Sequence, residues 1–255
     1  MELNRAQKRQ MYDDGYLVVR GAVPRLMIEE ARRAINHYLG ANGLHPDDLK
    51  KFSAQSYCPD LQNKPVITDI FNKSPLFPLC ESLVGEGNLL TTGGGQIALR
   101  FPRPTSDPAE PRGHIDGKGT GTNGIPEGEF RRGFTMLAVV LLSDLPEPYS
   151  GNFTVWPGSH RFFEKIFQEQ GPAALAKSVD HADTGSDPVQ ITGSAGDVVI
   201  CHHQIKHTAV PNSSPNIRYA AIFRGRHKDA EKNGVEAMTD IWREWPGVRE
   251  VVVAE

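Results

Sequence analysis

Cysteine is scarce in this sequence. Its three cysteines, Cys58, Cys80 and Cys201, are odd in number and do not fall at a metal-binding spacing. This argues against a disulfide framework of the kind that stabilises small secreted domains. We expect all three to be small buried hydrophobic residues.

Long apolar runs are also missing. The first 19 residues lack the apolar stretch of about 7 to 15 residues that a signal peptide needs. No window approaches the ~18 apolar residues of a membrane helix. We therefore expect a cytoplasmic protein that does not enter a membrane.

An excess of positive charge is absent as well. The chain has 28 Lys and Arg against 31 Asp and Glu, a formal net charge of -3. Nucleic acids and acidic membrane surfaces are therefore not expected partners. Linkers and internal repeats are not evident, so we expect one domain over residues 1 to 255, with a mostly helical layer at 1 to 88, a β core at 89 to 226 and a C-terminal extension at 227 to 255.

The two halves of the chain differ in pattern. Helical periodicity and Pro or Gly boundaries predict helices near the N-terminus, including one after Pro24 that ends at Gly40. From about residue 89, short strands alternate with Pro- and Gly-rich turns, which is typical of a sandwich or barrel. In the segment 96 to 101 apolar and other residues alternate, so one face packs and the other can line a polar cavity. The apolar segment 134 to 142 predicts a central strand covered on both sides.

His114 and Asp116 stand two residues apart between two loops, 102 to 113 and 117 to 130, that are rich in Pro and Gly. On a strand, their side chains would leave the same face about 6 to 7 Å apart, which one cation can bridge. Two histidines and one carboxylate occupy one face of an octahedron and leave three positions open. A solvated turn is the ordinary alternative for such a pair, so a third ligand must decide.

The third ligand is sought in the segment 196 to 224, which contains His202, His203 and His207. A hairpin centred between residues 212 and 213 would place His207 directly across from Arg218. Arg218 would then point inward among small apolar neighbours and would need an anion. His203 is the rival ligand, because it would share the inward face of an unbroken strand.

Four segments of the chain resemble the phytanoyl-CoA dioxygenase family of Fe(II)- and 2-oxoglutarate-dependent oxygenases. They are DDGYLVVRGAVP (13 to 24), HID (114 to 116), SGNFTVWPGSHR (150 to 161) and GDVVICHHQIKHTAVPNSSPNIR (196 to 218). The resemblance implies a mainly β fold with helices, a double-stranded β-helix or jelly-roll like that of cupins, behind an N-terminal helical layer. The chain departs from the family at Gly151 and Asn152, where Gly-Gly is frequent.

The resemblance also implies roles for individual residues. His114, Asp116 and His207 would bind Fe(II), and Arg218 would anchor the far carboxylate of 2-oxoglutarate. Gln96 and Thr135 would make further polar contacts to this co-substrate. With O2, such an enzyme hydroxylates an unactivated C–H of a small organic substrate and releases succinate and CO2. Halogenating relatives carry Ala or Gly in place of Asp116, so its carboxylate favours hydroxylation.

Two alternatives share these residues. One is a jelly-roll protein that binds a metal or small ligand without catalysis, and the other is a desaturating or ring-forming oxygenase with the same iron site. The charged residues around the expected mouth are either an ordinary mixed-charge rim or a pocket for a small anionic substrate. In the second case Arg131 or Arg132 would clamp the anion. The sequence does not specify the substrate or the oligomeric state.

Overall fold

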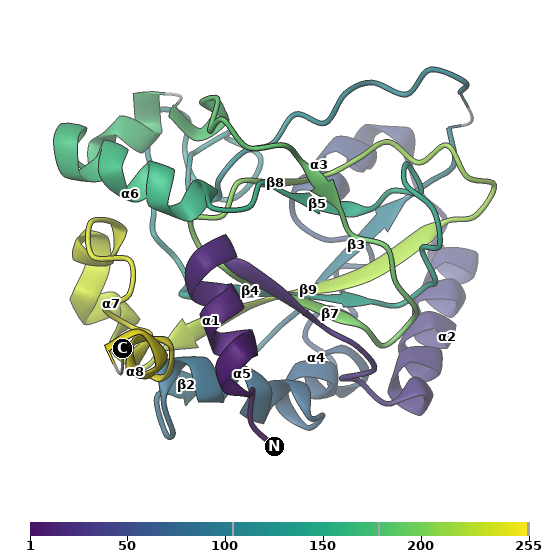
Figure 1. The fold of residues 1–255 in the computed structure, drawn as a ribbon. Coiled ribbons are helices and arrows are strands. Elements are labelled where there is room, and N and C mark those ends of the chain that lie inside the picture. Colours follow the sequence, from purple (N-terminus) through teal and green to yellow (C-terminus); the bar gives the residue numbers. More distant parts are fainter. Residues whose placement is uncertain (104, 178, 254–255) are drawn as a thin grey trace.

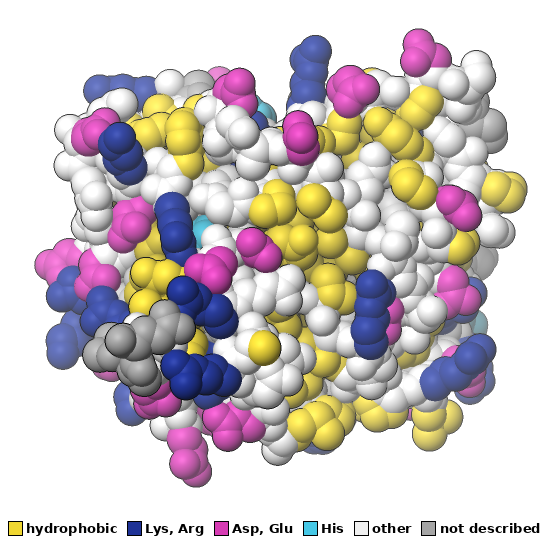
Figure 2. All heavy atoms as spheres, in the orientation of Figure 1, with side chains coloured by type: hydrophobic (Ala, Val, Ile, Leu, Met, Phe, Trp, Pro, Cys, Tyr) yellow, Lys and Arg dark blue, Asp and Glu magenta, His cyan; other side chains and the backbone are white. Residues whose placement is uncertain are grey.

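The computed structural model describes residues 1 to 103, 105 to 177 and 179 to 253 (Figure 1). Residue 104, in the first loop before His114, and the last two residues of the predicted C-terminal extension lie outside the described residues. Among the described residues, no helix is long and apolar enough to cross a membrane. Figure 2 shows positive and negative side chains interspersed over the face drawn there, as expected for a chain without a large net charge.

The strands form two antiparallel sheets. The six-stranded sheet contains β1 (Tyr16–Val19), β2 (Leu89–Leu90), β3 (Gln96–Arg100), β4 (Met136–Leu141), β7 (Val198–His202) and β9 (Arg218–His227). The three-stranded sheet contains β5 (Phe153–Val155), β6 (Val189–Gln190) and β8 (His207–Ala209). In the large sheet the order is β1-β7-β4-β9-β2, and β3 also pairs with β9. As the sequence predicted, short strands follow one another from about residue 89.

The helices lie mostly outside the sheets (Figure 1). They are α1 (Arg5–Asp14), α2 (Arg25–Asn42), α3 (Leu49–Ala54), α4 (Pro65–Asn72), α5 (Leu76–Val84), α6 (Ser159–Gln170), α7 (Ala230–Asn233) and α8 (Pro246–Val253). Short 3-10 helices are η1 (Pro46–Asp48), η2 (Pro172–Lys177), η3 (Val179–His181) and η4 (Gly234–Met238).

Local signals explain how two of these helices begin and end. Asn4 and Gln7 form a reciprocal capping box at the start of α1. The predicted stop of α2 at Gly40 was wrong, because the helix continues to Asn42 and ends at Gly43. Gly40 is tolerated inside the helix, where glycine costs only about 1 kcal/mol relative to alanine.

Strand β4 has apolar cores on both of its faces. Met136, Ala138 and Val140 pack with the helical layer, which includes buried residues of α2, α4 and α5. Leu137 and Val139 point the other way, into a second core with Phe153 and Val155 of the small sheet. This alternation explains why nearly every residue of the segment 134 to 142 is apolar, as the sequence predicted.

Candidate metal centre

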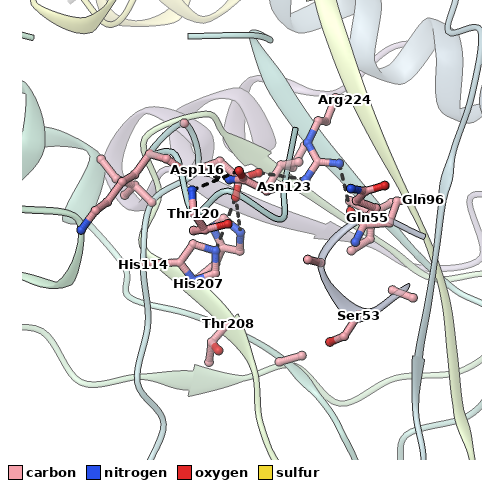
Figure 3. A pocket seen from close by; sticks show the side chains of 18 of the residues that line it. Ser53, Gln55, Gln96, His114, Asp116, Thr120, Asn123, His207, Thr208 and Arg224 are labelled. Atoms are coloured by element: carbon pink, nitrogen blue, oxygen red, sulfur yellow. Dashed lines mark hydrogen bonds and ion pairs between the residues drawn. The ribbon is translucent and has the colours of Figure 1, made fainter. Parts of the chain in front are cut away.

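His114, Asp116 and His207 meet at one point in the structure (Figure 3). One ligand atom from each lies within 4.8 Å of the others. The Asp116 Oδ1 atom is 3.4 Å from His114 Nε2 and 3.7 Å from His207 Nε2. Among the described residues, these three form the group of His, Cys, Asp or Glu side chains that could hold a metal ion. His203, the rival ligand, lies outside this group.

Backbone pairing brings the two histidines together. His114 and His207 form an isolated antiparallel bridge, with N···O distances of 3.0 and 2.9 Å. On its other side His207 pairs with Val155 of β5. His114 therefore extends the small sheet by a single residue, and the chain turns at Asp116 instead of continuing as a strand.

The predicted hairpin between His207 and Arg218 was wrong. Strand β8 pairs with β5 in the small sheet, whereas β9 pairs with β3 and β4 in the large sheet. Arg218 therefore lies opposite Arg100 and not opposite His207. The turn between these strands carries the chain from one sheet to the other, so Arg218 and His207 belong to different sheets that line the same cavity.

The electrostatics of the group favour metal binding. Burial alone would raise the pKa of Asp116, but the Arg224 guanidinium and the hydrogen bond with His114 hold that pKa well below its usual range. Burial lowers the pKa of His207 to about 4, although the Asp116 carboxylate opposes the shift. At neutral pH the site therefore offers a carboxylate and a neutral His207 imidazole, which are the forms that bind metals.

The tautomer of His207 is also suitable. His207 Nδ1 lies 3.0 Å from the main-chain carbonyl oxygen of Ile205. A carbonyl only accepts hydrogen bonds, so Nδ1 carries the proton and Nε2 presents its lone pair to the cavity. Two imidazole nitrogens and one carboxylate oxygen form a donor set that suits a divalent transition metal such as iron.

A cavity of about 780 Å³ opens over this group. Its lining comes from both sheets, from the end of α3 and from the loop after Asp116, and includes Ser53, Gln55, Tyr57, Gln96, Arg100, Lys118, Asn123, Arg131, Phe134, Phe153, Asp180, His181, Arg218 and Arg224. This volume is typical of a small-molecule site.

Arg218 is a buried cation in the cavity wall. The side chain donates to the carbonyl oxygens of Gly151 and Ala98 at 2.7 and 3.1 Å. Burial, followed by the nearby Arg100, lowers the pKa of Arg218 to about 9, so the guanidinium is still charged at neutral pH. No carboxylate among the described residues contributes to this environment. An anion in the cavity would satisfy both guanidinium groups.

At Gly151 the main chain passes close to both of these arginines, which are paired across β3 and β9. Its φ is 78°, and an added Cβ would lie 2.9 Å from the Arg100 Cβ and 3.1 Å from the Arg218 Cβ. The other departure from the family pattern, Asn152, is fully buried and bonds to the main chain of Ser150 and Ile191. Gly151 and Asn152 therefore determine the path of the main chain beside the cavity.

Gln96 and Thr135 occupy different environments. Gln96 lines the cavity, as the alternation in β3 predicted, and its Oε1 accepts from Arg224 at 3.0 Å. Thr135 is fully buried and does not line the cavity; its hydroxyl donates to Glu244 and accepts from the His227 amide. The structure therefore does not bring Thr135 to the site of the predicted co-substrate.

Arg132 is not a rim residue. Its guanidinium is 3% exposed and binds the Glu244 carboxylate, which is 1% exposed. Glu244 also accepts from Thr135 and from Asn233. The expectation that Arg132 could clamp a substrate was wrong, because its charge is compensated inside the protein by a residue of the C-terminal extension.

Several residues of the cavity were not predicted. Arg224 donates to Asp116 Oδ2 at 3.1 Å. Alternate residues of a strand share a face, so Arg224 could have been predicted to point inward with Arg218 and Ile222. His181 also lines the cavity, with its Nδ1 2.9 Å from the Gly113 carbonyl oxygen. Helix α3, which contributes Ser53, has no clear sequence signal.

The loop 117 to 130 folds over the cavity. Lys118 and Phe130 form an isolated bridge at its base, and Gln55 donates to the carbonyl oxygen of Thr122 at 2.7 Å. Gly117 has a φ of 112°, and an added Cβ would lie 2.6 Å from the Arg131 carbonyl oxygen. Glycine is therefore required where the chain leaves Asp116.

Replacing Glu244 by glutamine should destabilise the protein by about 3 kcal/mol at pH 7, because it leaves Arg132 buried without its counter-charge. Burial raises the pKa of Glu244, but Arg132 and the hydrogen bonds lower it below 4.5 overall. This contribution is thus present above about pH 4.5 and is lost as the pH falls through the native pKa. Urea unfolding of both proteins across this range measures it.

Glu236→Gln is the matched control, because Glu236 pairs with Arg243 at the surface with a side chain that is 66% exposed. Its free energy of unfolding should change by less than about 1 kcal/mol. A Glu244→Gln protein as stable as the wild type at pH 7 would contradict the assignment.

No family model matches the chain, and no curated protein matches it by sequence. Solved structures do resemble it. The non-heme alpha ketoglutarate dependent epimerase SnoN from nogalamycin biosynthesis is 18% identical, with a TM-score of 0.55 over 85% of this chain and 79% of that chain. HygX from Streptomyces hygroscopicus, solved with nickel and 2-oxoglutarate bound, is 16% identical, with a TM-score of 0.56 over 89% and 88%.

The alpha ketoglutarate dependent carbocyclase SnoK from nogalamycin biosynthesis is 18% identical, with a TM-score of 0.53 over 91% of this chain and 90% of that chain. At this level of identity the likeness shows the fold. The predicted jelly-roll fold with an N-terminal helical layer is confirmed.

Proposed function

We propose that this protein is a non-haem Fe(II)- and 2-oxoglutarate-dependent oxygenase of the phytanoyl-CoA dioxygenase family. The observation that carries the proposal is that His114, Asp116 and His207 face the same cavity as Arg218, a buried guanidinium without a carboxylate partner among the described residues. The solved neighbours support it, since SnoN and SnoK are alpha ketoglutarate dependent and HygX was solved with iron and with 2-oxoglutarate.

The residues of the chain have distinct roles in this proposal. His114, Asp116 and His207 hold Fe(II), which supplies O2 activation and the oxidative decarboxylation of 2-oxoglutarate. Arg218 binds the far carboxylate of the co-substrate with charge-assisted hydrogen bonds, and Arg100 adds positive charge beside it. Gln96, which lines the same cavity, is the proposed further polar contact to the co-substrate. Thr135 has no direct role, because Glu244 occupies its hydroxyl.

Hydroxylation is the proposed outcome, because Asp116 supplies a carboxylate where halogenating relatives have Ala or Gly. The neighbours keep a second outcome open, since SnoN is an epimerase and SnoK a carbocyclase. Such reactions differ from hydroxylation in the product and not in the ligands. Mass spectrometry separates them: hydroxylation adds one oxygen atom, whereas epimerisation and ring formation do not.

The proposed co-substrate site predicts a specific spectroscopic result. Without oxygen, Fe(II) and 2-oxoglutarate should give the wild-type protein a weak visible absorption band from the chelate. Asp116→Ala should abolish the band, and Arg218→Met should require a 2-oxoglutarate concentration at least about tenfold higher, since a bidentate contact is lost. Arg103→Met, which removes an exposed arginine outside this cavity, is the control.

A wild-type protein that binds Fe(II) but neither develops the band nor binds 2-oxoglutarate would contradict this function. That result would favour a jelly-roll protein that binds a metal or small ligand without catalysis.

A small anionic organic molecule is the proposed substrate. Arg131 is exposed at the cavity, whereas Arg132 is neutralised by Glu244. In a screen of small carboxylic acids and amino acids, we expect some acids to stimulate 2-oxoglutarate turnover. For these, Arg131→Met should raise the apparent KM about tenfold while kcat is kept. An unchanged KM would exclude Arg131 as the clamp.

A further inference from the structure

Arg224 is held in one orientation by three neighbours. Its Nη1 donates to Gln96 Oε1 at 3.0 Å and its Nη2 donates to Asp116 Oδ2 at 3.1 Å. The guanidinium carbon also lies 5.6 Å from the centre of the Phe134 ring. Figure 3 shows the two hydrogen bonds on opposite sides of the same planar group. A planar guanidinium with two fixed acceptors cannot turn without losing one of them.

The two oxygens of Asp116 consequently face different partners. Oδ1 points to the imidazoles of His114 and His207, at 3.4 and 3.7 Å from their Nε2 atoms. Oδ2 points away from them and is occupied by Arg224. A metal held by both histidines would therefore meet Oδ1, while the charge-assisted hydrogen bond retains Oδ2.

We propose that Arg224 is a positioning residue that makes Asp116 a one-oxygen ligand and so keeps three metal positions open. Carboxylates bind metals through one oxygen or through both. Binding through both would fill one of the three positions that a facial triad leaves. A 2-oxo acid that chelates through two atoms, together with O2, needs all three. The inference rests on the proposed function and adds a residue to it.

Existing contacts favour this role over substrate binding. The Arg224 side chain is 42% exposed, and each of its terminal nitrogens already donates one hydrogen bond, to Gln96 or to Asp116. Turning the guanidinium toward a substrate anion would cost these two hydrogen bonds. Arg103, which is exposed outside this cavity, is the control.

Water counting on the metal tests the coordination directly. With Mn(II) in place of iron and no co-substrate, the water-proton relaxation rate reports how many exchangeable waters the metal holds. Three open positions in the wild type should become two in Arg224→Met, a loss of about one third of the metal-bound contribution. Arg224→Lys should restore most of it, because an ammonium can still bind Oδ2, and Arg103→Met should match the wild type.

Co-substrate affinity is the second readout. In an anaerobic titration of the Fe(II) protein, Arg224→Met should bind 2-oxoglutarate about tenfold more weakly, in the range found for partners of metal ligands. Gln96→Leu, which removes one of the two acceptors of Arg224, should shift the affinity in the same direction by less. Circular dichroism confirms that each variant is folded.

An unchanged water count and an unchanged 2-oxoglutarate affinity in folded Arg224→Met would overturn the inference. So would a loss of metal affinity with the same number of waters on the metal that remains bound. If instead the water count falls as expected but the wild type never binds 2-oxoglutarate, the proposed function fails and the role of Arg224 at the metal stands.

Discussion

Two backbone hydrogen bonds between His114 and His207 hold the candidate site together. They join the segment before the loop 117 to 130 to β8, and they bring the two imidazole rings to a centroid distance of 4.8 Å. Asp116 follows two residues later, at a turn that only glycine at 117 permits. A shift of this pairing by one residue would turn His207 to the other face of the sheet, so the register of one short bridge determines whether three ligands converge.

The two sheets contribute different chemistry to the cavity between them. The small sheet and its extension supply the metal ligands, whereas β9 of the large sheet supplies Arg218 and Arg224 on its inward face. Arg224 is balanced by Asp116, but Arg218 and Arg100 have no such counter-charge in the described structure. A buried guanidinium beside a half-buried one costs free energy unless an anion joins them. The far carboxylate of the proposed 2-oxoglutarate would supply this negative charge.

Local patterns in the sequence predicted much of this arrangement. The alternation in β3 placed Gln96 and Arg100 on the cavity face, and the apolar run of β4 marked the strand between two cores. His114 and Asp116 were recognisable as a pair. These features depend on neighbours within a few residues, which a single sequence displays.

Features that depend on distant partners were not predictable in the same way. A turn between two strands does not show whether they pair or pass to opposite sheets, so the pairing of His207 with Arg218 was wrong. The sequence predicted that Thr135 and Arg132 lie at the cavity. In the structure both instead bind Glu244, which is more than 100 residues away in the chain. Arg224 could have been found, since it continues the inward face of Arg218.

A metal and a 2-oxo acid should bind together in this cavity. Equilibrium dialysis of 2-oxoglutarate against the protein, with and without Ni(II) as a redox-inert metal, tests this directly. We expect Ni(II) to strengthen 2-oxoglutarate binding at least about 100-fold, or ~2.7 kcal/mol, and His207→Ala to remove this gain. Binding that is absent, or equally strong without the metal, would contradict it.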